Sequence, residues 1–262
     1  MDNLTPKVEV PHTVESWTAG YAWQPIMIGD SASRVFKLER ENQGTRFLKI
    51  GPIHPTKEIT AEKERLHWLD GKLPVPEVLS HAIDENYEYL VTSAIPGTDT
   101  ASVGTELGGL ATARLLARGL RLIHEVPIND CPFDMTLNIV IPQARENALN
   151  GLVDEGDFDE KRLGKTAREL IPELESTIPA EEDVVFTHDD YCLPNVLVDA
   201  GEVAGFVDLS RAGIADHYKD IALAVRSLRH NTGQDLERAF LDEYGNTEAD
   251  SAKIEYYMLL DE

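Results

Sequence analysis

Four polar residues have the types and spacing needed for metal-assisted chemistry. They follow the pattern His-x-Asp-x₄-Asn-x₁₂-Asp and are His188, Asp190, Asn195 and Asp208. An amide oxygen and a carboxylate are ligands that Mg²⁺ prefers, with waters and phosphates completing its shell. Asp190 adds a second carboxylate, which can orient and deprotonate a hydroxyl. Taken singly, such residues more often cap a loop, but the full spacing is too specific for that explanation.

A β-hairpin is the element expected to position these residues. Apolar runs at 196–198 and 203–207 predict two short strands joined by a tight turn. Asn195 precedes the first strand and Asp208 follows the second, so both should lie at the open end of the hairpin. We therefore expect them to bind one hard cation, with Asp190 nearby.

The rest of the chain divides into a β-rich first part and a helical second part. The break between them is the hinge at 92–97, which contains Pro96 and Gly97. Hydrophobic periodicity and turn residues predict the individual elements. The first part has strands at 35–38, 47–50 and 87–92 and a helix at 58–70; the second has helices at 105–124, 143–149, 160–174, 216–228, 236–244 and 251–260, with a β-rich patch at 184–207.

One lysine of the first part is placed to hold an anion. In the strand at 47–50, Phe47 and Lys49 share one face and Leu48 and Ile50 the other. On the following helix, Glu62 falls within the apolar stripe, where a carboxylate without a partner is costly. We therefore expect a Lys49–Glu62 ion pair, which would fix the lysine for phosphate binding. The alternative is that Glu62 lies at the edge of the stripe and reaches water.

The charge balance excludes general nucleic-acid binding. The 262 residues include 24 Lys and Arg against 47 Asp and Glu, a formal net charge of −23. Residues 96–262 hold 14 bases and 33 acids, so most of the excess negative charge lies in the second part. Such a chain repels a phosphate backbone. The acids either form a solvated surface or receive a polycation, and charge alone leaves both open.

Composition also predicts where the protein works. No apolar run approaches 18 residues, which excludes a membrane span, and the first fifteen residues lack the apolar core of a signal peptide. Two cysteines are too few for a disulfide framework or a structural zinc site. We expect a cytoplasmic protein with reduced thiols, a monomer or weak dimer that binds neither membrane nor nucleic acid.

The stretch 187–228 resembles the aminoglycoside phosphotransferases, which are relatives of the protein kinases. It is similar in particular to the 3′-phosphotransferases that inactivate kanamycin and neomycin. The resemblance implies an α+β, two-lobed protein-kinase-like fold. Residues 1–95 would form a small antiparallel β-rich nucleotide-binding lobe, and 96–262 a larger, mainly helical catalytic and substrate-binding lobe. The matching segments are HDDYCLPN at 188–195, GFVDLSR at 205–211, DHYKDIALA at 216–224 and LLDE at 259–262.

The same resemblance implies the reaction and the roles of the residues. The activity would be MgATP-dependent phosphorylation of an aminoglycoside hydroxyl, the 3′-OH, which confers antibiotic resistance. Asp190 would be the catalytic base, and Asn195 and Asp208 would bind Mg²⁺. His188 and Asp220 would brace the catalytic loop. The ATP-binding residues would be Ser31, Phe47, Lys49, Glu62, Ser93 and Ala94.

An acidic segment indicates a cationic acceptor. Five of the seven residues at 154–160 are acids, and aminoglycosides are polyamines; the alternative is a solvated loop beside a helix N-terminus. Asp208 and Asp220 are only 12 residues apart, too close for the segment that seats a peptide in protein kinases. By the resemblance, the acceptor-binding residues would be Asp154, Asp157, Asp159, Glu160, Asp189, Arg211, Asp261 and Glu262.

One position of the motif departs from the family pattern. Asp189 stands where the family usually has glycine, between the histidine and the catalytic aspartate. If this position needs a positive φ, aspartate tolerates it better than most residues. We expect the extra carboxylate to raise the pKa of Asp190 or to contact a cationic substrate.

Two other functions fit the sequence. The first is a kinase of another small hydroxylated metabolite or antibiotic on the same fold, which would accept neutral or anionic acceptors. The second is a catalytically inactive nucleotide-binding protein, which would bind ATP without turnover. The presence of Lys49, Asp190, Asn195 and Asp208 argues against the second.

Overall fold

The computed structural model describes residues 10–26, 33–53, 58–156 and 158–262, and they divide into two compact units. The first unit runs to Gly97 and also includes Ala204–Arg211. The second comprises Thr98–Val203 and Ala212–Glu262. The boundary expected at residue 95 lies close to the end of the first unit, but the two units are not separated by a single break in the chain. The segment Ala204–Arg211, which carries Asp208, also belongs to the first unit.

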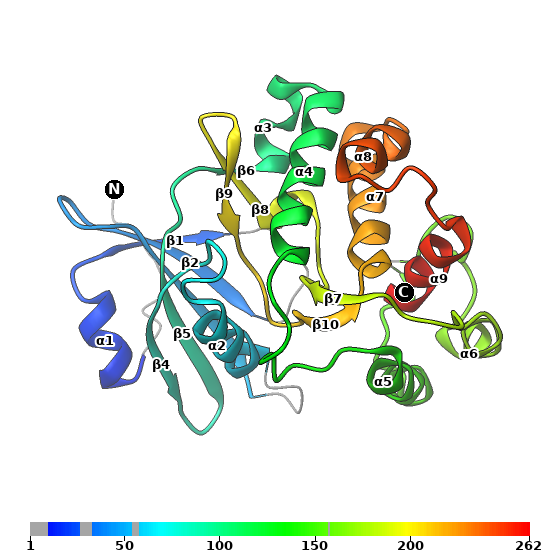
Figure 1. The fold of residues 1–262 in the computed structure, drawn as a ribbon. Helices are drawn as coiled ribbons and strands as arrows, with labels where there is room; N and C mark the ends of the chain where they lie inside the picture. Colours follow the sequence, from blue (N-terminus) through cyan, green and yellow to red (C-terminus); the bar gives the residue numbers. More distant parts are fainter. Residues whose placement is uncertain (1–9, 27–32, 54–57, 157) are drawn as a thin grey trace. The chain divides into compact units, whose positions relative to one another are not determined.

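The first unit is built on an antiparallel five-stranded sheet with strand order β1-β2-β3-β5-β4 (Figure 1). Its core contains Leu38, Leu48, Ile50 and Val91, all buried. Leu48 and Ile50 alternate with the less buried Phe47 and Lys49, so the predicted faces of that strand are confirmed. The elements are α1 (His12–Thr18), β1 (Ala22–Ile26), β2 (Arg34–Glu39), β3 (Arg46–Pro52), α2 (Glu58–Leu69), β4 (Val78–Ile83) and β5 (Tyr87–Ser93).

The second unit is mainly helical. Helix α4 packs against α7 and α8, and α7 packs against α9 (Figure 1). Buried leucines, alanines and isoleucines of α4 and α7 supply much of its core. The helices are α3 (Thr100–Leu107), α4 (Gly109–His124), α5 (Leu137–Asn150), α6 (Ala167–Ser176), α7 (Tyr218–Thr232), α8 (Glu237–Tyr244) and α9 (Ser251–Asp261).

Several helix boundaries differ from the sequence prediction, and two of the differences have a clear local cause. The helix expected over 105–124 is two helices, because Gly108 adopts a φ of 80° between them. The helix expected over 160–174 begins only at Ala167. Thr166 and Glu169 form a reciprocal capping box there, in which each side chain accepts the backbone N–H of the other residue.

Short strands carry the polar motif. Strand β7 (Val184–Thr187) pairs with β10 (Gly213–Asp216), while β6 (Thr98–Asp99), β8 (Val196–Asp199) and β9 (Glu202–Phe206) form a second small sheet. The hairpin expected between β8 and β9 is confirmed. Its two-residue turn, Ala200 and Gly201, has positive φ at both positions, as a type I′ turn requires.

Two smaller expectations can also be compared with the structure. Within the described part of the chain, no helix has the length and apolar character needed to cross a membrane. Cys131 and Cys192 are not joined in a disulfide.

Candidate active site

The first unit holds a lysine between two carboxylates. Lys49, in β3, donates from Nζ to Oε2 of Glu62 in α2 and to Oδ1 of Asp208, each at 2.9 Å. The Lys49–Glu62 ion pair predicted from the strand and helix periodicities is therefore confirmed. The Asp208 contact was not predicted, because it joins positions 159 residues apart in the sequence.

The two carboxylates keep Lys49 charged. Burial alone would lower the pKa of its ammonium group, but attraction to Glu62 and Asp208 outweighs burial and raises that pKa above its usual value. Glu62 is buried, whereas the Asp208 side chain is nearly half exposed. Glu62 thus fixes the lysine within the unit, and Asp208 presents its carboxylate at the surface of the unit.

The positions of the remaining residues expected to bind ATP give less support for a nucleotide site. Ser31 lies outside the described residues, and Phe47 is partly buried on the same face of β3 as Lys49. The backbone N–H of Ser93 donates to the carbonyl of Glu77, and that of Ala94 to the carbonyl of Thr45. An adenine bound at this hinge would have to compete with these two hydrogen bonds or use other backbone groups.

In the second unit, a buried aspartate anchors the loop that follows β7. The backbone N–H groups of His188 and Asp189 donate to Oδ2 and Oδ1 of Asp220, at 2.7 and 2.8 Å. His124 Nε2 lies 3.1 Å from the same Oδ2. Burial tends to raise the pKa of Asp220, but the hydrogen bond from His124 and the nearby donors lower it overall. These are the contacts expected of a loop brace.

Asp190 and Asn195 face each other across this loop. Asn195 Nδ2 donates to the backbone carbonyl and to Oδ2 of Asp190, both at 2.9 Å. Because the amide donors point to Asp190, the amide oxygen Oδ1 lies on the other side of the group. That oxygen is the atom type Mg²⁺ accepts, so Asn195 fits the role of a metal ligand. Asp208 belongs to the other unit, and its sharing of a cation with Asn195 stays a prediction.

The expected contact of Asp189 with a substrate is not supported. Asp189 has a φ of 64°, which places it in the left-handed region that the family glycine would occupy without strain. It is fully buried, and its Oδ1 lies 2.5 Å from Nζ of Lys219, which is buried as well. The carboxylate is therefore neutralised by a lysine of the same unit and does not face a cationic acceptor.

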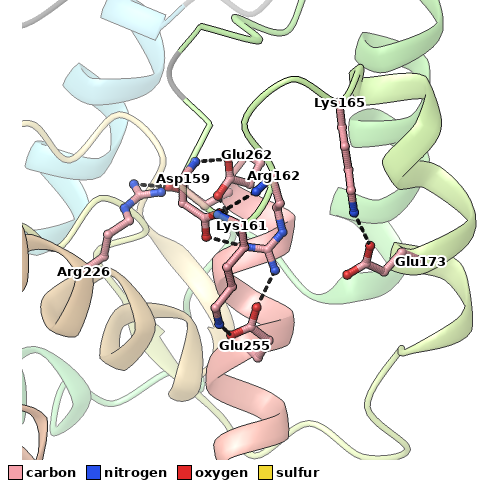
Figure 2. Close-up of polar contacts among 9 residues, drawn as sticks. Asp159, Lys161, Arg162, Lys165, Glu173, Arg226, Glu255 and Glu262 are labelled. Carbon is pink, nitrogen blue, oxygen red and sulfur yellow. Dashed lines mark hydrogen bonds and ion pairs between the residues drawn. The ribbon is translucent and has the colours of Figure 1, made fainter.

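The acids expected to bind the acceptor fall into two groups. Asp159 and Glu262 contact the guanidinium of Arg162 (Figure 2), and Asp261 pairs with Arg226. These acids are thus held by cations of the same unit, which the sequence analysis did not anticipate. Of the other residues expected to bind the acceptor, Asp154, Glu160 and Arg211 are exposed, and Asp157 lies outside the described residues.

Arg162 is the centre of the first group. Its side chain is only 2% exposed and contacts Asp159, Glu255 of α9 and Glu262 (Figure 2). Glu262 Oε2 also accepts the backbone N–H of Asp159, at 3.0 Å. Burial, more than any other cause, raises the pKa of Glu262 to about 7. The cluster joins the acidic loop to the end of α9.

Sequence reasoning missed three buried cationic or titratable residues, namely Arg162, Lys219 and His124. Lys219 carried a usable signal: an extra acid inside a buried motif requires a cation, and Lys219 directly precedes the bracing Asp220. Arg162 and His124 carried none. Arg162 has one partner close in sequence, Asp159, but its partner Glu255 lies 93 residues away, and the partner of His124, Asp220, lies 96 residues away.

A family model described as the phosphotransferase enzyme family matches residues 23–257. The chain belongs to this family. It is therefore a phosphotransferase.

The sequences of individual family members match this phosphotransferase over nearly its whole length. An aminoglycoside 3′-phosphotransferase of Streptomyces fradiae is 36% identical, covering 100% of this chain and 99% of the relative. Another, from Niallia circulans, is 39% identical over 90% of each chain. Matches of this length show that the similarity includes both units rather than the motif alone.

Solved structures of aminoglycoside phosphotransferases are also similar to this chain. The crystal structure of an aminoglycoside 3′-phosphotransferase of type VIII is 36% identical and superposes with a TM-score of 0.85 over 95% of each chain. An aminoglycoside phosphotransferase of Streptomyces rimosus, solved with ADP and streptomycin, is 28% identical with a TM-score of 0.80 over 95% of each chain. The phosphotransferase has the protein-kinase-like fold, and the expected fold class is confirmed.

Proposed function

We propose that this phosphotransferase transfers the γ-phosphoryl group of MgATP to the 3′-hydroxyl of aminoglycosides such as kanamycin and neomycin, and so confers resistance to them. The observation that carries the proposal is the full-length similarity to aminoglycoside 3′-phosphotransferases at 36 and 39% identity. The Streptomyces rimosus relative was solved with both a nucleotide and an aminoglycoside, which supports the same substrate classes here. Since ATP is the donor, we propose that the enzyme works in the cytoplasm.

Lys49 holds the phosphates of ATP in this proposal. Its ammonium group stays charged because Glu62 and Asp208 flank it at 2.9 Å, and a fixed cation neutralises charge on phosphate oxygens. Asp208 and the amide oxygen of Asn195 would hold Mg²⁺. The ion, when bound, neutralises the charge that develops on the phosphoryl oxygens.

Asp190 acts on the hydroxyl. Its carboxylate, to which the Asn195 side chain donates, accepts a hydrogen bond from the substrate hydroxyl in this proposal. The hydroxyl oxygen forms a bond to the γ-phosphorus as the bond to the bridging oxygen of ADP breaks, and the hydroxyl proton passes to Asp190. Positioning and charge neutralisation supply most of the rate in such transfers.

The acceptor is held by acids of the second unit. Asp154 and Glu160 are exposed on the acidic loop, and Asp159, Asp261 and Glu262 form the group already paired with arginines. An exposed ion pair contributes only about 0–1 kcal/mol, so selection of a polyamine requires several acids acting together.

The test is ADP release with MgATP and four acceptors: kanamycin, neomycin, tobramycin, which lacks the 3′-hydroxyl, and choline. We expect turnover with the first two only. Asp190→Ala should abolish it while ATP still binds, and Asp199→Asn, at the exposed turn of the β8–β9 hairpin, should leave it unchanged. Turnover with choline would indicate another acceptor class, and ATP binding without turnover on any acceptor would indicate an inactive nucleotide-binding protein.

A further inference from the structure

The residue before the proposed catalytic base carries a buried charge. The Asp189 side chain is only 1% exposed, and its backbone lies in the left-handed region. A carboxylate in this position must be matched by a cation, because burying a lone charge is strongly unfavourable. Lys219 provides that cation from the first turn of α7, with its Nζ 2.5 Å from Asp189 Oδ1 and its own side chain 6% exposed.

Lys219 and its neighbour Asp220 hold the same residue in different ways. Asp220 accepts the backbone N–H groups of His188 and Asp189, while Lys219 holds the Asp189 side chain. Together they fix both the backbone and the side chain of Asp189 against the start of α7. The backbone conformation of residue 189 determines the position of the next residue, Asp190.

The other buried acid near this turn does not need Lys219. Asp216 accepts from Lys253 Nζ at 2.7 Å and from the backbone N–H of Asp183 and of Tyr218. Lys219 is therefore the cation matched to Asp189. A glycine at 189 would adopt the same backbone conformation without any need for a buried lysine at 219.

We propose that Lys219 is a positioning residue, and that the buried Asp189–Lys219 ion pair fixes the loop that carries Asp190 in the geometry that phosphoryl transfer requires. This inference rests on the proposed function only where it is tested by turnover, because the kcat and KM measurements use the proposed reaction. Lys219 touches no reacting atom in this account; it acts through Asp189.

The experiment is a double-mutant cycle in the full-length protein. Asp189→Asn keeps a residue that tolerates a positive φ, and Lys219→Gln removes the partner charge. We expect each single variant to lower kcat at least tenfold with KM for ATP and kanamycin changed less than threefold. The double variant, which buries no charge at either position, should recover kcat to within threefold of the wild type. The exposed Arg238→Gln in α8 is the matched control and should have no effect.

Hydrogen–deuterium exchange of the loop at 188–195 gives a readout independent of turnover. We expect faster exchange there in each single variant and restored protection in the double variant. If Lys219→Gln alone does not fold, Asp189→Asn is compared with the double variant, and the proposal requires the double to be the faster enzyme.

The outcomes separate the two proposals. No turnover by the wild type on any acceptor would refute the proposed function, and loop exchange would still test the ion pair. Single variants with unchanged kcat and exchange, or losses that add in the double variant, would overturn the positioning role of Lys219.

Discussion

Replacing Arg162 by methionine should destabilise the second unit strongly. The guanidinium and the Glu262 side chain are each only 2% exposed, and Asp159 and Glu255 complete the cluster around Arg162 (Figure 2). Removing one partner of a buried charge pair costs about 3–5 kcal/mol, because the remaining charges lose their counter-ion. For a protein of this size each kcal/mol shifts Tm by about 2–4 °C, so Arg162→Met should lower Tm by about 6–20 °C.

Lys165→Met is the matched control. Lys165 lies three residues further along the chain and pairs with Glu173, but the two side chains are 46 and 45% exposed (Figure 2). An exposed pair of this kind contributes about 0–1 kcal/mol. The control therefore removes one positive charge from the same region of the protein. We expect it to lower Tm only slightly.

The pH dependence of the loss follows from Glu262. Because its folded-state pKa is raised to about 7 from an ordinary 4.5, the folded protein favours the protonated form. Ionising Glu262 therefore costs folding free energy. This cost is absent below about pH 4.5 and grows as the pH rises towards 7. Arg162 offsets that cost, so the Arg162→Met deficit should be larger at pH 8 than at pH 5.5.

Thermal unfolding of the wild type and both variants at the two pH values is the assay. A Tm for Arg162→Met equal to that of Lys165→Met at pH 8 would refute the argument from burial. A deficit that grows as the pH falls would refute the role assigned to Glu262.

Three further predictions concern other parts of the molecule. Glu62→Gln removes a charge-assisted hydrogen bond to Lys49, worth about 1.5–3 kcal/mol, so kcat/KM for ATP should fall about 10- to 150-fold; an unchanged value would remove Glu62 from the nucleotide site. Asn195→Ala should raise the Mg²⁺ concentration needed for half-maximal activity, measured by titration, and an unaltered requirement would contradict its role as a ligand. Thr166→Ala breaks the capping box of α6 and should destabilise the protein by about 0.5–2 kcal/mol in thermal unfolding, whereas the exposed Thr177→Ala at its other end should cost less.

The parts of the fold predicted from sequence are those set by local pattern. Alternation in β3 identified which face of the strand is buried, and the apolar stripe of α2 identified Glu62 as the partner of Lys49. The helix break at Gly108 and the capping box at Thr166 are also local, but periodicity alone does not reveal them. Strand β10 was not predicted, because its pairing with β7, which is distant in the sequence, defines it rather than its own residues. Strand β4 was also not predicted, although its partner β5 follows it directly in the chain.

The candidate site was predictable only as far as its residues lie close in sequence. The contact between Asp190 and Asn195 joins residues of one short motif. The bracing role of Asp220, which accepts a backbone N–H group 31 residues away, came from the family resemblance and not from spacing. Arg162 looked like any surface arginine, since its partner Glu255 lies 93 residues away. The acids of the acceptor side were therefore identified by type, while the cations that hold them were not.

The position of the phosphoryl group on the product decides whether the enzyme phosphorylates the 3′-hydroxyl. Kanamycin is incubated with the enzyme and MgATP, and the product is analysed by ¹H–³¹P correlation NMR. We expect one phosphate, bonded to the 3′ oxygen, and no such product from the Asp190→Ala variant. A phosphate on any other oxygen, or an unmodified antibiotic in the presence of an enzyme that binds ATP, would contradict it.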